Sequence, residues 1–204
     1  MRRWLKNNAL SVTVFSAFLI FLILQAIFGW HASNAELTEH GQPTDSFPSY
    51  LTSGEFFEAV FENWESEFLQ MGFYVLLTAY LIQRGSAESK KETGQEEPTQ
   101  TRSFGRLIYE NSLVIALLSI FVLSFILHLL GGTAAYNEEQ VEHGSSKVSV
   151  IEFLGNPEFW FQSMQNWQSE FLAVGALIVL SIFLRQKGSP QSKKVDDPNS
   201  KTGV

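Results

Sequence analysis

Hydrophobic residues in this chain form two long uninterrupted runs and two shorter ones. Residues 7–30 and 111–137 contain no Asp, Glu, Lys or Arg. Both runs exceed the roughly 18 apolar residues that distinguish a membrane-spanning helix from a buried core helix. A shorter apolar stretch follows each of them, at 68–83 and 171–184. The pattern therefore predicts four transmembrane helices, over about 9–29, 64–83, 112–132 and 167–186.

The two halves of the chain resemble each other. A shift of 103 residues aligns 3–91 with 106–194 without a gap, and 33 of the 89 aligned residues are identical. Self-similarity at a fixed period indicates a duplicated structural unit. We therefore predict an all-α integral membrane four-helix bundle, built from two parallel tandem repeats of two transmembrane helices each. The first repeat is 1–91 and the second is 106–194.

Two polar segments lie outside the predicted helices. Residues 86–105 and 188–204 are rich in Ser, Lys, Gln, Thr and acidic residues. Such a composition does not bury enough apolar surface to offset the entropy of ordering. We expect 86–105 to be a flexible linker between the repeats and 188–204 to be a disordered tail.

Lysine and arginine are distributed unevenly about the predicted spans. They precede the first span, lie between the second and third, and follow the fourth, whereas 31–67 contains none and 133–170 contains only Lys147. Positive residues favour the cytoplasmic side of a membrane. We predict cytoplasmic termini, a cytoplasmic linker, and two outward-facing loops that carry 8 and 6 acidic residues. A cleaved signal peptide explains the first run less well, because its duplicate at 112–132 is internal.

Each outer loop ends in a helix signal. Ser53 is a suitable N-cap for a helix, and Asn156 followed by Pro157 is suitable at the matching place. Aromatic residues then recur at helical spacing through 53–67 and 156–170. These amphipathic segments lead towards the second span of each repeat. The sequence leaves open whether they lie on the membrane surface or continue into the spans.

The motif E-x-x-E-H-G occurs once in each outer loop. Glutamate and histidine four residues apart share one face of a helix, a spacing that suits a divalent metal. The alternative is a solvated extension of the first span, which the glycine terminates. The metal candidates are Glu36, Glu39, His40, Glu139, Glu142 and His143.

The second spans are short and begin next to acidic residues. Glu67 is followed by 16 uncharged residues and Glu170 by 14, which gives about 24 and 21 Å of helix against a hydrocarbon core of roughly 30 Å. Carboxylates at that depth are expected to face the bundle interior or water. We predict either an ion or proton site or interhelical hydrogen bonds that fix the bundle. The candidates are Asn63, Glu67, Asn166, Glu170, Gln25 and His128.

The composition excludes several kinds of chemistry. The chain contains no cysteine, so thiol zinc sites and iron–sulfur clusters are excluded. Its net charge of −7 argues against nucleic-acid binding, which requires a basic surface. Nucleotide-binding, nucleophile-elbow and zinc-protease motifs are lacking. We expect no enzymatic activity and no cofactor. The expected partners are the lipid bilayer and either a second copy of the chain or another membrane protein.

Three motifs resemble a family of small bacterial multi-pass membrane proteins of unknown function. They are E-H-G in the first loop, N-W-E-S-E-F-L-Q-M-G at 63–72 and Q-R-G-S-A-E-S-K at 83–90. The resemblance covers most of 1–91 and, more loosely, 104–194, where Gln168, Ala173, Val174 and Pro190 depart from the pattern. It implies location in the bacterial cytoplasmic membrane and brings no catalytic residues with it.

These observations leave three functional hypotheses. The first is a non-enzymatic inner-membrane protein with a structural or accessory role. The second is a small ion or proton channel, or a transporter, that uses Glu67 and Glu170. The third is an outward-facing metal or ligand sensor based on the E-x-x-E-H-G loops.

Overall fold

The computed structural model describes residues 2–89 and 103–203, which form helices and irregular segments with no strand among them. This agrees with the predicted all-α class. The chain divides into two units: Met1–Ala59 with Leu130–Val148 form unit 1, and Val60–Leu129 with Ser149–Val204 form unit 2. Most of the predicted linker 86–105 lies outside the described residues.

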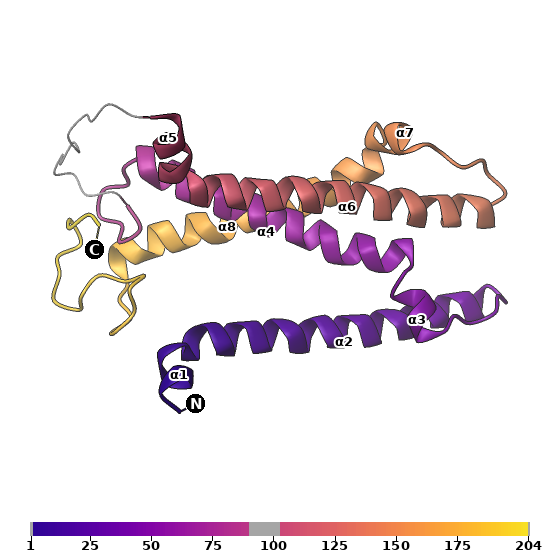
Figure 1. The fold of residues 1–204 in the computed structure, drawn as a ribbon, viewed down its shortest axis with the longest axis horizontal. Helices are drawn as coiled ribbons and strands as arrows, with labels where there is room; N and C mark the ends of the chain where they lie inside the picture. Colours follow the sequence, from indigo (N-terminus) through magenta and orange to yellow (C-terminus); the bar gives the residue numbers. More distant parts are fainter. Residues whose placement is uncertain (1, 90–102, 204) are drawn as a thin grey trace. The chain divides into compact units, whose positions relative to one another are not determined.

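Eight helices are present in the described part of the chain (Figure 1). In the first half they are α1 (Arg2–Asn7), α2 (Ala9–Glu39), α3 (Phe47–Tyr50) and α4 (Gly54–Tyr80). In the second half they are α5 (Phe104–Glu110), α6 (Ser112–Glu142), α7 (Val150–Leu154) and α8 (Pro157–Phe183). The helices α2 and α6 each have 31 residues, and α4 and α8 each have 27. The second helix of each pair begins 103 residues after the first, which is the offset found in the sequence.

Local sequence signals explain the ends of the long helices. The Asn156 side chain accepts a hydrogen bond from the backbone N–H of Glu158, with Pro157 at the first helical position, and Ser53 accepts one from Phe56. The helices α2 and α6 continue past the apolar runs and end before Gly41 and Gly144, whose φ angles are 70° and 72°. Such positive φ angles favour glycine at a helix C-terminus.

The segments 53–67 and 156–170 belong to single continuous helices. Neither α4 nor α8 is interrupted between its N-cap and the apolar stretch that follows. Within residues 2–89 and 103–203, three helices are long and apolar enough to cross a membrane: Ala9–Glu39, Ser112–Val141 and Pro157–Phe183. The fourth predicted span, 64–83, coincides with the later part of α4 and extends beyond it. Glu65, Glu67 and Gln70 lower the apolar content of this part of α4.

In unit 1, one asparagine in each half holds the loop that follows the long apolar helix. The Asn34 side chain donates to the carbonyl of Asp45 (3.0 Å) and accepts from its N–H (2.6 Å). The Asn137 side chain does the same with Val148, at 2.9 and 2.7 Å. An amide side chain carries a donor and an acceptor on two separate atoms, so asparagine is suited to both positions.

The polar segment after α8 makes more contacts than its composition predicts. Between 188 and 203 there is no helix, yet Lys193 is buried. Its ammonium group donates to the carbonyls of Gly85 (2.5 Å), Asn199 (3.0 Å) and Ile182 (3.2 Å). These bonds join the segment to the end of α8 and to the turn that follows α4.

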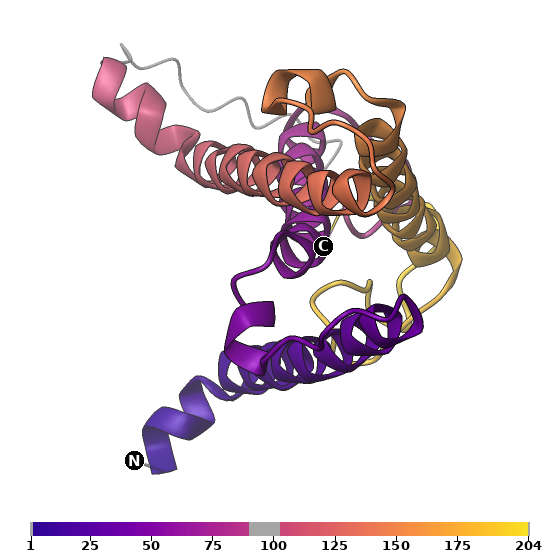
Figure 2. The same cartoon turned by 90° about the vertical axis from the view of Figure 1, so that its right-hand side faces the viewer.

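In unit 2, the later part of α4 packs with α6 and α8 (Figure 2). A Cβ atom built on Gly72 would lie 2.8 Å from a methyl group of Leu118 on α6. A Cβ atom built on Gly175, the equivalent glycine of α8, would meet nothing within 4 Å. The two matched glycines therefore differ in whether a neighbouring helix approaches them.

We expect this difference to appear in alanine variants of the two glycines. Gly72→Ala overpacks the contact with Leu118 and should lower the free energy of unfolding by about 1–3 kcal/mol. Gly175→Ala places its methyl group in open space and should cause no loss, because alanine favours helix over glycine. Thermal unfolding in detergent, followed by circular dichroism, measures both. Equal behaviour of the two variants would contradict the packing of α6 against Gly72.

Candidate functional site

Glu65 of α4 is the centre of a buried polar network in unit 2. Its Oε2 atom lies 2.9 Å from Nδ1 of His128 on α6, and both side chains have an exposed fraction of 0%. Its Oε1 atom accepts hydrogen bonds from the Ser163 hydroxyl (2.8 Å) and the Trp167 indole N–H (3.1 Å) of α8. One carboxylate thus connects three helices.

Helical spacing explains how α8 supplies two donors to one oxygen. Ser163 and Trp167 are four residues apart and therefore lie on the same face of the helix. His128 lies in the middle of α6, where every neighbouring position is apolar or small. Its imidazole supplies the contact that this stretch makes with Glu65.

Both ring nitrogens of His128 face hydrogen-bond acceptors. Nδ1 faces the Glu65 carboxylate, and Nε2 lies 3.3 Å from Oε1 of Gln162 on α8. A histidine that donates from both nitrogens is an imidazolium. The Phe159 ring lies 4.9 Å from the imidazole, centroid to centroid, and offers its π-electrons to that charge. An imidazolium at this position would therefore satisfy both acceptors.

A second carboxylate lies one helical turn before Glu65. Glu62 is half-buried, and its Oε1 atom accepts a hydrogen bond of 2.5 Å from the Asn166 side chain. Its charge interacts with those of His128 and Glu65. We name Glu62, Glu65 and His128 the acid–histidine cluster.

No other cation of the surrounding helices balances these acids. The helices α4, α6 and α8 contain no lysine or arginine, and His128 is their only histidine. With His128 protonated and both carboxylates ionised, the acid–histidine cluster carries a net charge of −1. Aromatic side chains separate the network from water: Phe153 and Phe159 are 1% and 0% exposed, and Phe125 packs against Phe159 at 5.3 Å.

The structure brings some of the predicted polar residues together and leaves others apart. His128 pairs with Glu65, and Asn166 pairs with Glu62. Glu67 is exposed, as is Asn63. Glu170 is half-buried, and its backbone carbonyl accepts a hydrogen bond from Gln70.

Gln25 is in unit 1, where its side chain donates to the carbonyl of Ala59 (3.2 Å). Ala59 and Gln162 occupy equivalent positions in the two halves. Gln25 therefore contacts Ala59 of α4, and His128 contacts the equivalent residue of α8, Gln162.

The E-x-x-E-H-G motifs lie at the exposed ends of α2 and α6. The His40 imidazole bonds to the backbone carbonyl of Glu36, and His143 lies 3.9 Å from the carboxylate of Glu139. Glu39 is exposed, and the side chain of Glu142 lies outside the described residues. Within the part of the chain that the structure describes, no three of His, Asp and Glu come close enough to hold a metal ion.

Sequence reasoning missed Glu65 and Glu62, although the repeat contains a signal that distinguishes them. At the offset of 103, Glu62 aligns with Gln165, Glu65 with Gln168, and Gln25 with His128. All three titratable members of the cluster therefore have glutamine at the equivalent position. Glu67 and Glu170 are identical in the two repeats and were therefore predicted, whereas Glu62 and Glu65 have no acidic counterpart.

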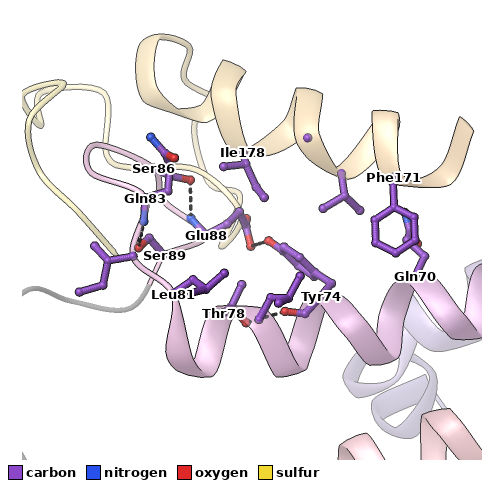
Figure 3. Close-up of a pocket in the computed structure, with 14 residues that line it drawn as sticks. Gln70, Tyr74, Thr78, Leu81, Gln83, Ser86, Glu88, Ser89, Phe171 and Ile178 are labelled. Atoms are coloured by element: carbon purple, nitrogen blue, oxygen red, sulfur yellow. Dashed lines mark hydrogen bonds between the residues drawn. The ribbon is translucent and has the colours of Figure 1, made fainter. Parts of the chain in front are cut away.

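A separate pocket of about 340 Å³ lies between α4 and α8 (Figure 3). Its walls are mainly apolar side chains, among them Leu77, Phe171 and Ile178. The segment after α4 closes one end, where the Tyr74 hydroxyl donates to the Glu88 carboxylate at 2.7 Å. None of the residues that line this pocket belongs to the acid–histidine cluster.

The chain belongs to the family described as Domain of unknown function (DUF6766), whose model matches residues 1–204. A comparison with curated proteins finds no match, and a comparison with solved structures finds none either. The family agrees with the resemblance to proteins of unknown function. Its description assigns no role to Glu65 or His128, so a function has to be argued from the residues.

The buried pair predicts a specific pattern of stabilities. Glu65→Gln and His128→Gln each leave one buried partner without its counterpart and should each cost about 3–5 kcal/mol of unfolding free energy. The double variant leaves no unpaired charge at either position and should recover part of this loss. Denaturant unfolding in detergent measures all three.

Glu67→Gln is the matched control, because it makes the same change at an exposed position two residues away. We expect its stability to stay within about 0.5 kcal/mol of the original chain. A Glu65→Gln variant as stable as Glu67→Gln would contradict the buried pair.

Proposed function

We propose that this member of the DUF6766 family is a non-enzymatic multi-pass protein of the bacterial cytoplasmic membrane with a structural or accessory role. In this proposal α2, α4, α6 and α8 form a four-helix bundle of two parallel repeats. Both termini are cytoplasmic, and the loops that contain α3 and α7 face outward.

The observation that carries the membrane assignment is the large exposed apolar surface of the long helices. In the most apolar 18-residue windows of α2, α6 and α8, only 6%, 11% and 6% of the residues are buried. On α2, Leu10, Phe21 and Phe28 are 80%, 69% and 66% exposed. Contiguous apolar surface of this extent is unfavourable in water and is expected where lipid chains cover it.

The distribution of charge supports the orientation. Residues 31–67 and 133–170 carry 8 and 6 acidic residues and a single lysine, whereas the segments after α4 and α8 are rich in lysine and arginine. Positive residues next to short spans favour the cytoplasmic side. The exposed acidic residues of the two loops then face a common, outward surface.

The buried network supports a structural role. Glu65 bonds to side chains of α6 and α8 at once, so it fixes the position of α4 against both. Polar contacts between membrane helices contribute about 0.6–2 kcal/mol each. A partly polar helix such as α4 gains most from such contacts, because its own apolar surface is small.

Single cysteines test this topology directly, because the chain has none of its own. Suitable positions are Thr44, Ser146 and Ser200, which are exposed. Ser46 and Ser149 are less suitable, because they cap α3 and α7. We expect Thr44→Cys and Ser146→Cys to react with an impermeant thiol reagent in intact cells, and Ser200→Cys to react only after lysis.

The three-variant set also distinguishes four spans from three. If α4 does not cross the membrane, Ser146 lies on the cytoplasmic side and Ser200 on the outer side. In intact cells the reagent then labels Thr44→Cys and Ser200→Cys but not Ser146→Cys. Labelling of Ser200→Cys alone in intact cells would overturn the orientation.

A further inference from the structure

We propose that the acid–histidine cluster is a proton-binding site, in which Glu62 takes up and releases a proton while Glu65 and His128 remain an ion pair. The cluster combines two carboxylates from α4 with one imidazole from α6. The side chains that α8 packs against it are Gln162, Ser163, Asn166 and Trp167, and none of them titrates in the physiological range.

The charge balance creates the need for a proton. One imidazolium neutralises one of the two carboxylates, and the remaining charge of −1 lies where the helices supply no lysine or arginine. Protonation of a carboxylate to a carboxylic acid brings the cluster to zero charge and requires no other reactant. The proton comes from water and returns to it.

The repeat contains no second copy of this cluster at the equivalent positions. Those positions hold Gln165, Gln168 and Gln25, none of which titrates. Gln165 and Gln168 are exposed, and Gln25 donates to the carbonyl of Ala59. The buried titratable groups are therefore specific to the positions of Glu62, Glu65 and His128.

The geometry assigns the exchangeable proton to Glu62 rather than to Glu65. Glu65 is fully buried, and its two carboxylate oxygens are occupied by contacts with His128, Ser163 and Trp167. Glu62 is half-buried, so it retains access to water. It precedes the predicted span 64–83, and burial raises the pKa of its carboxyl group above the usual range.

The side of the membrane that supplies the proton rests on the topology proposed above. Glu62 lies in the N-terminal half of α4, nearer to the outward loop than to the cytoplasmic segments. Proton uptake at Glu62 therefore follows the pH of the outer side. It alters the acceptor of the Asn166 hydrogen bond and hence the contact of α4 with α8.

Infrared spectroscopy of the full chain in lipid nanodiscs tests the proposal. As the pH is lowered, a carboxylic-acid carbonyl band should appear above the ordinary glutamate pKa of about 4.3. Burial also raises the pKa of Glu55, so Glu62→Gln should weaken this band rather than remove it, whereas Glu67→Gln, the exposed control on the same helix, should leave it unchanged. A band of unchanged intensity in Glu62→Gln, or one that appears only in the ordinary glutamate range, would overturn the assignment.

A second measurement leaves Glu62 unchanged and so does not depend on the folding of its variant. Replacing the exposed His31, His40 and His143 with glutamine leaves His128 as the only source of histidine ¹⁵N signals. These signals should keep imidazolium character and shift as Glu62 titrates. Loss of the His128 proton near the ordinary pKa of about 6.5 would place the exchange on the imidazole and refute the proposal. The cysteine-labelling test of topology is independent of both the infrared and the ¹⁵N result, so the proton site and the topology can fail separately.

Discussion

The pairing of Glu65 with His128 is the interaction on which the packing of unit 2 depends. A single ionised carboxylate removed from water costs several kcal/mol, and four features offset that cost here: the His128 imidazole, a hydroxyl, an indole N–H and the aromatic side chains packed around them. Because these groups come from α6 and α8, the full set of contacts to Glu65 forms only when both helices are in place. The packing of three helices in unit 2 therefore depends on one buried carboxylate.

The elements of the fold were predictable because their causes are local. Uninterrupted apolar runs produced α2 and α6, Asn156 with Pro157 marked the start of α8, and Gly41 marked the end of α2. The all-helical class follows from the same patterns. The continuity of α4 and α8 was left open by the sequence, since an amphipathic segment is compatible with either a surface helix or an extension of a span.

The buried pair was not predictable in the same way, because it depends on how the helices are rotated against one another. Glu65 and Glu67 differ by two residues, or about 200° around a helix, so one faces the interior when the other is exposed. Identity between the repeats favoured Glu67 with Glu170. The interior position was instead the one where the repeats differ, Glu65 against Gln168.

Solid-state NMR on the protein in lipid bilayers, labelled with ¹⁵N-histidine and ¹³C-glutamate, tests the central contact most directly. The account predicts a strong dipolar coupling between Nδ1 of His128 and the side-chain carboxyl carbon of a glutamate, as the 2.9 Å separation of Nδ1 and Oε2 requires. The coupling should vanish in Glu65→Gln and persist in Glu67→Gln. Absence of the coupling in the original chain, with its helices intact, would contradict the account.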